Sequence, residues 1–325
     1  MIPLRIGTRG SELALFQANA VASLLRDASG TPTEIVVIKT SGDRLADATL
    51  SEIGGKRLFV KEIEEALLDR HIDLAVHSSK DMPVSLPDGL AIGAVLPRED
   101  ARDAVVLPAG LAGTESETVD SLTRILGREP RIGTSSVRRI AQLSRLWPAA
   151  RFAPIRGNLN TRLRKLDGGE FDALVLASAG LLRLRQGDRI TAALPIDACV
   201  PAPGQGIIAV EIRTDDETTA RLVQGIDDRD ATVALAAERA VIVQLGGGCQ
   251  MPIGAHASAS GTTLRMSAVV VSLDGTRAAH AAGDGTVDDP EGLGQTIAQQ
   301  LRDDGADEIL ADVLRAHANV EGLQP

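Results

Sequence analysis

The tetrapeptide Arg-Ile-Gly-Thr occurs twice in this chain, as Arg5-Ile-Gly-Thr8 and as Arg131-Ile-Gly-Thr134. Each copy runs from a strand-like segment through a turn into a helix-like segment led by a serine. A looser repeat follows in the same order, because Asp73-Leu-Ala-Val-His-Ser78 resembles Asp172-Ala-Leu-Val-Leu-Ala177. Two similar α/β domains with largely parallel sheets are therefore predicted. Their helix N-termini would face one cleft, where free N–H groups and the helix dipole favour an anion.

Hydrophobic periodicity extends this pattern and divides the chain into three domains. The first α/β domain is expected to comprise residues 1–97 and 201–216, with Ser11 as the N-cap of its first helix. The second, arginine-rich α/β domain is expected at 98–200. A smaller α+β domain is expected at 217–325, with two helical stretches on each side of a hairpin that turns at Asp274-Gly275.

The arginines are distributed unevenly. Nine of the 29 fall between residues 128 and 164, a stretch with one acidic residue and no lysine, in a chain of net charge -10. They are Arg128, Arg131, Arg138, Arg139, Arg145, Arg151, Arg156, Arg162 and Arg164. Planar guanidiniums suit bidentate recognition of carboxylate or phosphate, so a multiply anionic ligand is indicated. The alternative is a solvated helix face with ion pairs, which the shortage of acidic partners weakens.

Composition excludes several classes of protein. Four Phe, one Trp and no Tyr leave few platforms for stacking bases, and the acidic balance opposes nucleic-acid binding. No apolar run is long enough to span a membrane, and the N-terminus lacks the apolar region of a signal peptide, so a cytoplasmic location is expected. With only Cys199 and Cys249, neither a disulfide framework nor a thiolate zinc site is expected.

Two segments predict anion binding. Gly133-Thr-Ser-Ser-Val-Arg-Arg139 combines a helix N-terminus with the hydroxyls of Thr134 and Ser136 and two arginines. Arg156-Gly-Asn-Leu-Asn-Thr-Arg162 repeats this arrangement, with Asn158 as the expected N-cap. Ordinary capping with exposed arginines is the alternative for both.

Two further places could carry chemistry. Cys249 follows three glycines in Leu245-Gly-Gly-Gly-Cys249, and a thiol on such an open loop suits covalent chemistry, although free cysteines are more often buried. Cys199 fits that structural role better. Lys80 and Asp81 follow a strand end, where ligand sites of α/β folds lie, and could form an acid–base pair or a surface ion pair.

Several segments together resemble the porphobilinogen deaminase (hydroxymethylbilane synthase) family. They occur in the family's order: Thr8-Arg-Gly-Ser-Glu-Leu-Ala-Leu15, Gly54-Gly-Lys-Arg-Leu-Phe-Val-Lys-Glu62, Ala75-Val-His-Ser-Ser-Lys-Asp-Met-Pro83, Gly133 to Arg139, Arg156 to Arg162, Pro203-Gly-Gln-Gly206 and Gly247-Gly-Cys-Gln-Met-Pro-Ile-Gly254. The resemblance implies two periplasmic-binding-protein-like α/β domains around a cleft and a smaller α+β C-terminal domain that carries the cofactor cysteine. It also implies a monomer.

The resemblance further implies an activity and a cofactor. Cys249 would hold a dipyrromethane through a thioether, built from the enzyme's own substrate or product. Four porphobilinogen units would be added head to tail with loss of ammonia each time, and hydrolysis would release hydroxymethylbilane. Each unit brings an acetate and a propionate, so the growing chain needs many fixed cations. No metal is implied.

Residue roles follow from the same resemblance. Asp81 matches the catalytic aspartate, whose carboxylate would stabilise the azafulvene-like cation left by ammonia and shuttle protons. Cofactor binding would involve Cys249, Lys80, Asp81, Ser78, Arg138, Arg139, Thr134, Ser136 and Arg162. Substrate binding would involve Arg9, Ser11, Arg156, Arg183 and Lys56. The chain departs from the family pattern at Gly10, Ser79, Pro203 and Gly246, none of which removes a charged catalytic group.

Alternatives remain at this point. A polycarboxylate solute-binding protein would share the two-domain cleft but would not need Cys249. A thiol hydrolase would need a histidine beside Cys249, and His256 is the nearest in sequence. A nucleic-acid-binding protein would explain the arginines, but the acidic balance and the scarcity of aromatic residues oppose it.

Overall fold

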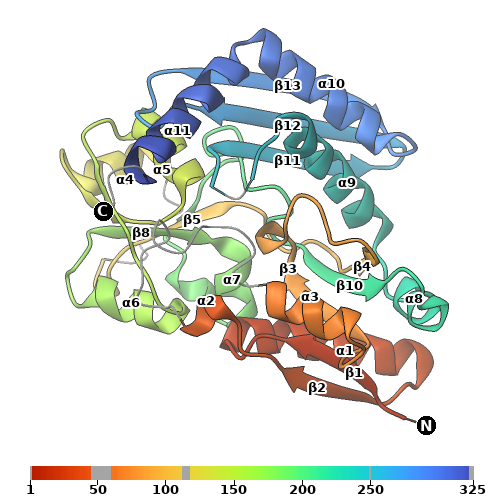
Figure 1. The fold of residues 1–325 in the computed structure, drawn as a ribbon. Coiled ribbons are helices and arrows are strands. Elements are labelled where there is room, and N and C mark those ends of the chain that lie inside the picture. The colour runs from red at the N-terminus through yellow and green to blue at the C-terminus, as the bar shows by residue number, and fades with distance from the viewer. Residues whose placement is uncertain (1, 45–59, 112–117, 249, 322–325) are drawn as a thin grey trace.

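A computed structural model describes residues 2–44, 60–111, 118–248 and 250–321 of the chain. Its strands form two five-stranded sheets and one three-stranded sheet (Figure 1). The mixed α/β architecture confirms the predicted fold class. Across the described part of the chain, no helix is both long and apolar enough to cross a lipid bilayer.

The first five-stranded sheet has the order β2-β1-β3-β10-β4. Its strands are β1 (Leu4–Thr8), β2 (Thr33–Val37), β3 (Leu74–Ser78), β4 (Leu90–Val95) and β10 (Ile208–Arg213). β10 runs antiparallel to both β3 and β4, whereas β1 is parallel to β2 and β3. The accompanying helices are α1 (Glu12–Ser29), α2 (Ser41–Arg44), α3 (Lys61–Leu68), α8 (Glu217–Gln224) and the 3-10 turn η1 (Ser79–Asp81). The sheet is therefore largely parallel, as predicted.

The second five-stranded sheet repeats this topology in the order β7-β6-β8-β5-β9. Its strands are β5 (Asp103–Val106), β6 (Arg131–Gly133), β7 (Arg151–Ala153), β8 (Ala173–Ala177) and β9 (Ala192–Ala193). Its helices are α4 (Val119–Leu126), α5 (Val137–Leu146), α6 (Leu159–Asp167), α7 (Ser178–Arg183) and η2 (Gly187–Arg189). β5 occupies the place of β10, because it runs antiparallel to β8 and β9. The sequence repeat thus corresponds to a structural repeat.

Side-chain caps explain where the helices beside the cleft begin. The Ser11 hydroxyl accepts a hydrogen bond from the Ala14 N–H, and the Ser136 hydroxyl accepts one from the Arg139 N–H. The Asn158 side chain accepts one from the Thr161 N–H in the same way. Each cap satisfies a backbone donor that the first helical turn leaves unpaired. The predicted N-caps at Ser11 and Asn158 are confirmed.

The chain crosses twice between the five-stranded sheets, from β4 to β5 and from β9 back to β10. The first strand after each crossing is the one that runs antiparallel to its neighbours in the sheet that the chain enters. The predicted return of the segment after Ile207 to the first sheet is therefore confirmed. The domain limits at residues 97, 200 and 216 stay a prediction.

The C-terminal part packs helices onto the three-stranded sheet (Figure 1). Its elements are α9 (Arg229–Gln244), β11 (Ile253–Ser260), β12 (Thr263–Val271), β13 (Ala278–Thr286), α10 (Pro290–Asp303) and α11 (Ala306–Glu321). β12 and β13 form the predicted hairpin, in which Val271 pairs with Ala278. The sequence interpretation missed β11, which pairs with β12 along its whole length. β11 consists mostly of Gly, Ala and Ser, which lack the β-branched signal of a strand.

Candidate active site

A cavity of about 570 Å³ lies between the two five-stranded sheets, within the range usual for small-ligand sites. The first half of the fold contributes Arg9, Ser11, Gln17, Ser78, Lys80 and Asp81, among others. The second half contributes Ser135, Arg139, Arg156, Asn158, Arg162 and Arg183. We call it the larger cavity. Ser11 and Glu12 at the start of α1 line it together with Ser135 and Arg139 at the start of α5, which confirms that the helix N-termini after the two Arg-Ile-Gly-Thr segments face one cleft.

Cations dominate the polar lining of the larger cavity. Arg183 donates to the Gly206 carbonyl at 2.7 Å, and the Arg162 Nε donates to the Gly157 carbonyl at 2.9 Å. Burial lowers the pKa of both guanidiniums from their usual value. Arg156 is half-buried and makes no hydrogen bond or ion pair with any residue that the structure describes. Such a guanidinium can take a ligand carboxylate without breaking an existing contact.

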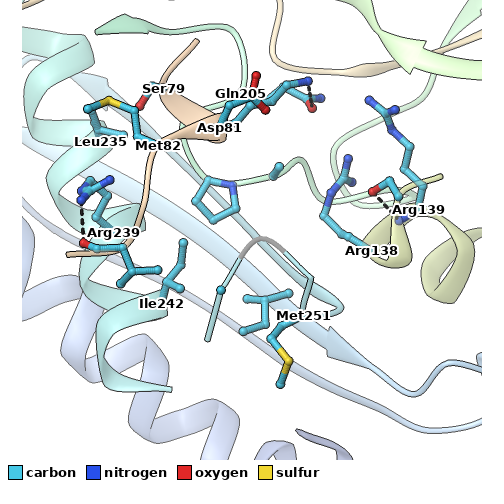
Figure 2. A pocket seen from close by; sticks show the side chains of 17 residues that line it. Ser79, Asp81, Met82, Arg138, Arg139, Gln205, Leu235, Arg239, Ile242 and Met251 are labelled. Atoms are coloured by element: carbon cyan, nitrogen blue, oxygen red, sulfur yellow. Dashed lines mark hydrogen bonds between the residues drawn. The ribbon is translucent and has the colours of Figure 1, made fainter. Parts of the chain in front are cut away.

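A second cavity of about 210 Å³, the smaller cavity, adjoins the larger one. Figure 2 shows Arg138 and Arg139 at one end, with Leu235, Arg239 and Ile242 of α9 at the other. Gly248, which directly precedes Cys249, also lines it. Lys80, Asp81 and Arg139 line both cavities. The smaller cavity therefore connects the neighbourhood of the cysteine loop with the cleft.

Lys80 and Asp81 lie in η1, directly after β3, where the sequence placed them at a strand end. Burial and the nearby Arg139 charge lower the pKa of Lys80 to about 8. The Lys80 Nζ donates to the Gln205 side-chain oxygen at 3.4 Å. The Asp81 side chain is exposed toward the cavities and has no hydrogen-bond partner among the described residues. A carboxylate so placed is open to a bound substrate.

Arg138 and Arg139 are both buried, at 4% and 8% exposure, and both pair with Asp103. The Arg138 Nη1 lies 2.8 Å from one carboxylate oxygen, and the Arg139 Nη2 lies 2.8 Å from the other. Burial alone would raise the pKa of Asp103, but the two guanidiniums outweigh it and hold that pKa well below its usual range. The sequence interpretation missed Asp103, although a carboxylate at the start of an apolar strand could have drawn attention to it.

Other predicted residues lie apart from the cavities or outside the described residues. Thr134 is buried, accepts from the Ser136 N–H, and is not among the described residues that line either cavity, whereas Ser136 lines the smaller one. Lys56 and Cys249 lie outside the described residues. Cys199 is buried, and burial together with Asp103 raises the pKa of its thiol to about 12, as a structural role predicts.

The arginine-rich stretch divides between the site and the surface. Arg138, Arg139, Arg156 and Arg162 line the cavities. Among the others, Arg151 forms an exposed ion pair with Glu129. Some arginines of the stretch therefore line the candidate anion site, as the first interpretation predicted. Arg151 instead forms its ion pair on the solvated surface, as the alternative predicted.

Sequence comparisons identify relatives of the whole chain. The model described as "Porphobilinogen deaminase, dipyromethane cofactor binding domain" matches residues 4–221, and "Porphobilinogen deaminase, C-terminal domain" matches residues 232–303. The chain belongs to the porphobilinogen deaminase family. A porphobilinogen deaminase of Geobacter metallireducens is 45% identical over 95% of this chain and 94% of its own length. One of Acidithiobacillus ferrooxidans is 46% identical over 96% of this chain and 99% of its own.

Solved structures resemble the chain only weakly. A Bordetella pertussis BvgS VFT2 domain has a TM-score of 0.41 and 16% identity, covering 69% of this chain and 85% of that one. An ancestral cationic amino acid solute-binding protein has a TM-score of 0.42 and 14% identity, covering 69% and 88%.

Family membership makes the chain a transferase of tetrapyrrole biosynthesis with a dipyrromethane cofactor, so the solute-binding alternative is not favoured. The residues around the smaller cavity fit that group. Four cationic side chains line this cavity, those of Lys80, Arg138, Arg139 and Arg239. Fixed cations of this kind suit a ligand that carries several carboxylates.

Proposed function

We propose that this chain makes hydroxymethylbilane by joining four porphobilinogen units head to tail, with ammonia released at each addition, on a dipyrromethane held through a thioether to Cys249. The position of Lys80, Asp81 and Arg139 in the walls of both cavities supports this most directly, because one set of charges can then serve primer and incoming substrate. Gly248 in the wall of the smaller cavity supports attachment at the next residue.

Cofactor carboxylates would be bound by Lys80, Arg138 and Arg139, with hydroxyl donors from Ser78 and Ser136. Thr134 would act through its hydrogen bond to the Ser136 backbone. Each guanidinium offers a planar pair of donors to a carboxylate. Arg138 keeps its Nη2 for this purpose, since its Nη1 is occupied by Asp103 and the Val200 carbonyl.

Substrate carboxylates would be bound in the larger cavity. Arg9, Ser11, Arg156 and Arg183 line it and face the acetate and propionate of porphobilinogen in this proposal, with Arg162 between the two sites. Lys56 would add a further cation. The absence of a partner for Arg156 among the described residues favours a direct contact with substrate.

Asp81 would be the catalytic residue. When bound, the dipyrromethane supplies the nucleophilic pyrrole carbon at which the chain is extended. The Asp81 carboxylate would lie beside the substrate pyrrole N–H, stabilise positive charge as ammonia leaves, and accept the proton released after the new bond forms. Lys80 and Arg139 would keep the neighbouring carboxylates away from Asp81 by binding them.

The quaternary state, location and domain limits are part of the same proposal. We take the chain to act as a cytoplasmic monomer, with domains at 1–97 plus 201–216, 98–200 and 217–325. The grouping of strands into three sheets supports these limits.

The test compares Asp81→Asn with the matched control Asp88→Asn, an exposed aspartate of the same sheet's loop. Asp81→Asn should reduce kcat roughly hundredfold or more, as loss of a general acid–base group does. Intact mass under denaturing conditions should still reveal two covalently linked pyrrole units in both variants and none in Cys249→Ala. Near-normal turnover of Asp81→Asn would overturn the catalytic role, and an unmodified wild-type mass even after incubation with hydroxymethylbilane would overturn the function.

A further inference from the structure

Asp103 carries more hydrogen bonds than a structural ion pair requires. Its carboxylate is completely buried at the start of β5. It accepts from the Arg138 Nη1 at 2.8 Å, from the Arg139 Nε and Nη2 at 2.9 and 2.8 Å, and from the Gln205 amide at 2.9 Å. The Cys199 thiol donates to it at 3.3 Å. It is not among the described residues that line either cavity.

These contacts fix the direction of two neighbouring guanidiniums. Arg139 binds Asp103 through two nitrogens and reaches the Val175 carbonyl with the third, at 3.0 Å. Arg138 divides its Nη1 between Asp103 and the Val200 carbonyl. Two arginines that follow one another in a helix would otherwise repel in a desolvated site. The carboxylate holds both at the end of the smaller cavity.

Gln205 extends the network to the opposite wall. Its amide nitrogen donates to Asp103 and, at 2.7 Å, to the Ala101 carbonyl, which fixes the side chain. Its oxygen is thereby aimed at Lys80, from which it accepts a hydrogen bond. One buried carboxylate thus connects cations that come from α5 with the lysine of η1.

We propose that Asp103 is a positioning residue that sets the geometry of the cofactor-binding cations, Arg138 and Arg139 directly and Lys80 through Gln205. This role rests on the function proposed above, since it presupposes that these cations bind the cofactor carboxylates. Asp103 touches neither cofactor nor substrate. It acts by fixing donors before the ligand arrives, which reduces the cost of ordering them on binding.

Among the described residues, the charged groups that act on Lys80 include Arg139, Arg138, Asp81 and Asp103. The two arginines lower the pKa of Lys80, whereas the two carboxylates raise it. Loss of the Asp103 charge should therefore shift the deprotonation of Lys80 to lower pH, which simple loosening of the fold would not do.

The experiment measures covalent loading of the full-length apoprotein by preformed hydroxymethylbilane, as mass excess against time between pH 6 and 9. Asp103→Asn removes the charge and keeps the shape. Cys199→Ala, the matched control, removes a neutral partner of the same carboxylate. Thermal melting establishes that each variant is folded. Asp103→Asn should load at least about tenfold more slowly, as misplacement of positioned groups by a fraction of an ångström does. The pH above which its loading rate falls, which we call the alkaline limb, should be about one unit lower than in the wild type, because a neighbouring negative charge is lost. Cys199→Ala should load like the wild type.

Several outcomes would overturn the role of Asp103. A folded Asp103→Asn that loads at the wild-type rate with the same pH profile contradicts it, and so does equal slowing by Cys199→Ala, which would indicate packing alone. If Asp103→Asn does not fold, Gln205→Met decides, since it keeps both ion pairs of Asp103 and removes the hydrogen bonds through which Gln205 connects Asp103 and the Ala101 carbonyl with Lys80. Slower loading with a lower alkaline limb supports the role, and unchanged loading refutes it. Failure of the wild type to load would instead refute the function itself and the role with it.

Discussion

Glu238 of α9 is the point at which the C-terminal part of the chain contacts both crossings between the five-stranded sheets. It is completely buried and accepts four hydrogen bonds. Two come from Arg98 at 2.8 Å each, one from the Gly204 N–H at 2.6 Å and one from the Ala257 N–H at 2.7 Å. Glu238→Gln would replace one acceptor oxygen with an NH2 group, which must then face donors. We expect a large loss of stability.

The size of that loss follows from the burial. Removing one member of a buried, hydrogen-bonded ion pair costs about 3–5 kcal/mol of unfolding free energy. An unfolding entropy of about 2.1 cal/mol/K per residue gives about 0.7 kcal/mol/K for the 325 residues. The melting temperature should therefore fall by about 4–7 °C if the chain unfolds as one unit, and by more if the C-terminal part unfolds alone.

Differential scanning calorimetry of the holoprotein provides the measurement, and Glu217→Gln provides the control. Glu217 pairs with Arg221 at 3.1 Å, but both side chains are largely exposed. Such pairs contribute about 0.2–1 kcal/mol, so the control should shift the melting temperature by about 1 °C or less. If Glu238→Gln shifted it no more than Glu217→Gln does, the reasoning from burial and hydrogen bonding would be refuted.

Three further predictions concern the site. Because burial and Arg139 lower the pKa of Lys80 to about 8, the folded apoprotein releases this proton more readily than the unfolded chain. Covalent loading of the apoprotein by hydroxymethylbilane should therefore slow above about pH 8, and loading of Lys80→Arg, which stays charged, should not; an equal decrease in both proteins would contradict this. Arg156→Gln should raise KM about tenfold or more, as loss of a charged hydrogen bond does. Arg164→Gln, at an exposed position of the same stretch, is the control and should leave KM unchanged. Equal KM values for the two variants would contradict the substrate-binding role of Arg156. Gly204→Ala should lower the free energy of unfolding, measured with denaturant, by about 1–3 kcal/mol. The reason is that Gly204 has a φ of 72° and that the new methyl group would meet the Ser79 hydroxyl. An unfolding free energy equal to that of the wild type would contradict this.

Much of the fold could be predicted because it is repeated. The duplicated Arg-Ile-Gly-Thr strand ends, with a capping serine after each, predicted two equivalent α/β units, and both sheets have the same strand order. Local signals were enough here, since turn, cap and hydrophobic period agree over short stretches. β11 lacked such a signal, because its residues are small and its strand character comes from pairing with β12.

The types of residue in the candidate site could be predicted from the sequence, but the ion pairs between them could not. Sequence showed many arginines and an anion-binding pattern. It did not show that Arg138 and Arg139 bind Asp103, because a strand that enters the second sheet only after the chain crosses over delivers that carboxylate. It also did not show Arg239, which reaches the Pro83 and Val84 carbonyls from α9. Contacts between elements distant in sequence leave no local pattern.

The repeat itself explains why the countercharge lies where it does. In the second sheet Asp103 pairs with Ala177 at the end of β8, and the equivalent place in the first sheet is Ile208, paired with Ser78 at the end of β3. The two positions share backbone geometry but differ in charge. The difference must therefore come from what the adjacent helix presents.

The two halves differ in the residues that follow the capping serine of each helix. The second and third residues after Ser136 are Arg138 and Arg139, whereas those after Ser11 are Leu13 and Ala14. Cations occur in the first turn of only one of the two helices, and the buried carboxylate occurs in the same half of the molecule. An aspartate at the Ile208 position would be buried without a guanidinium to pair with, at a cost of several kcal/mol. Countercharge and cations therefore form one unit, and this unit distinguishes the half of the cleft that carries Arg138 and Arg139 from the half that carries Asp81.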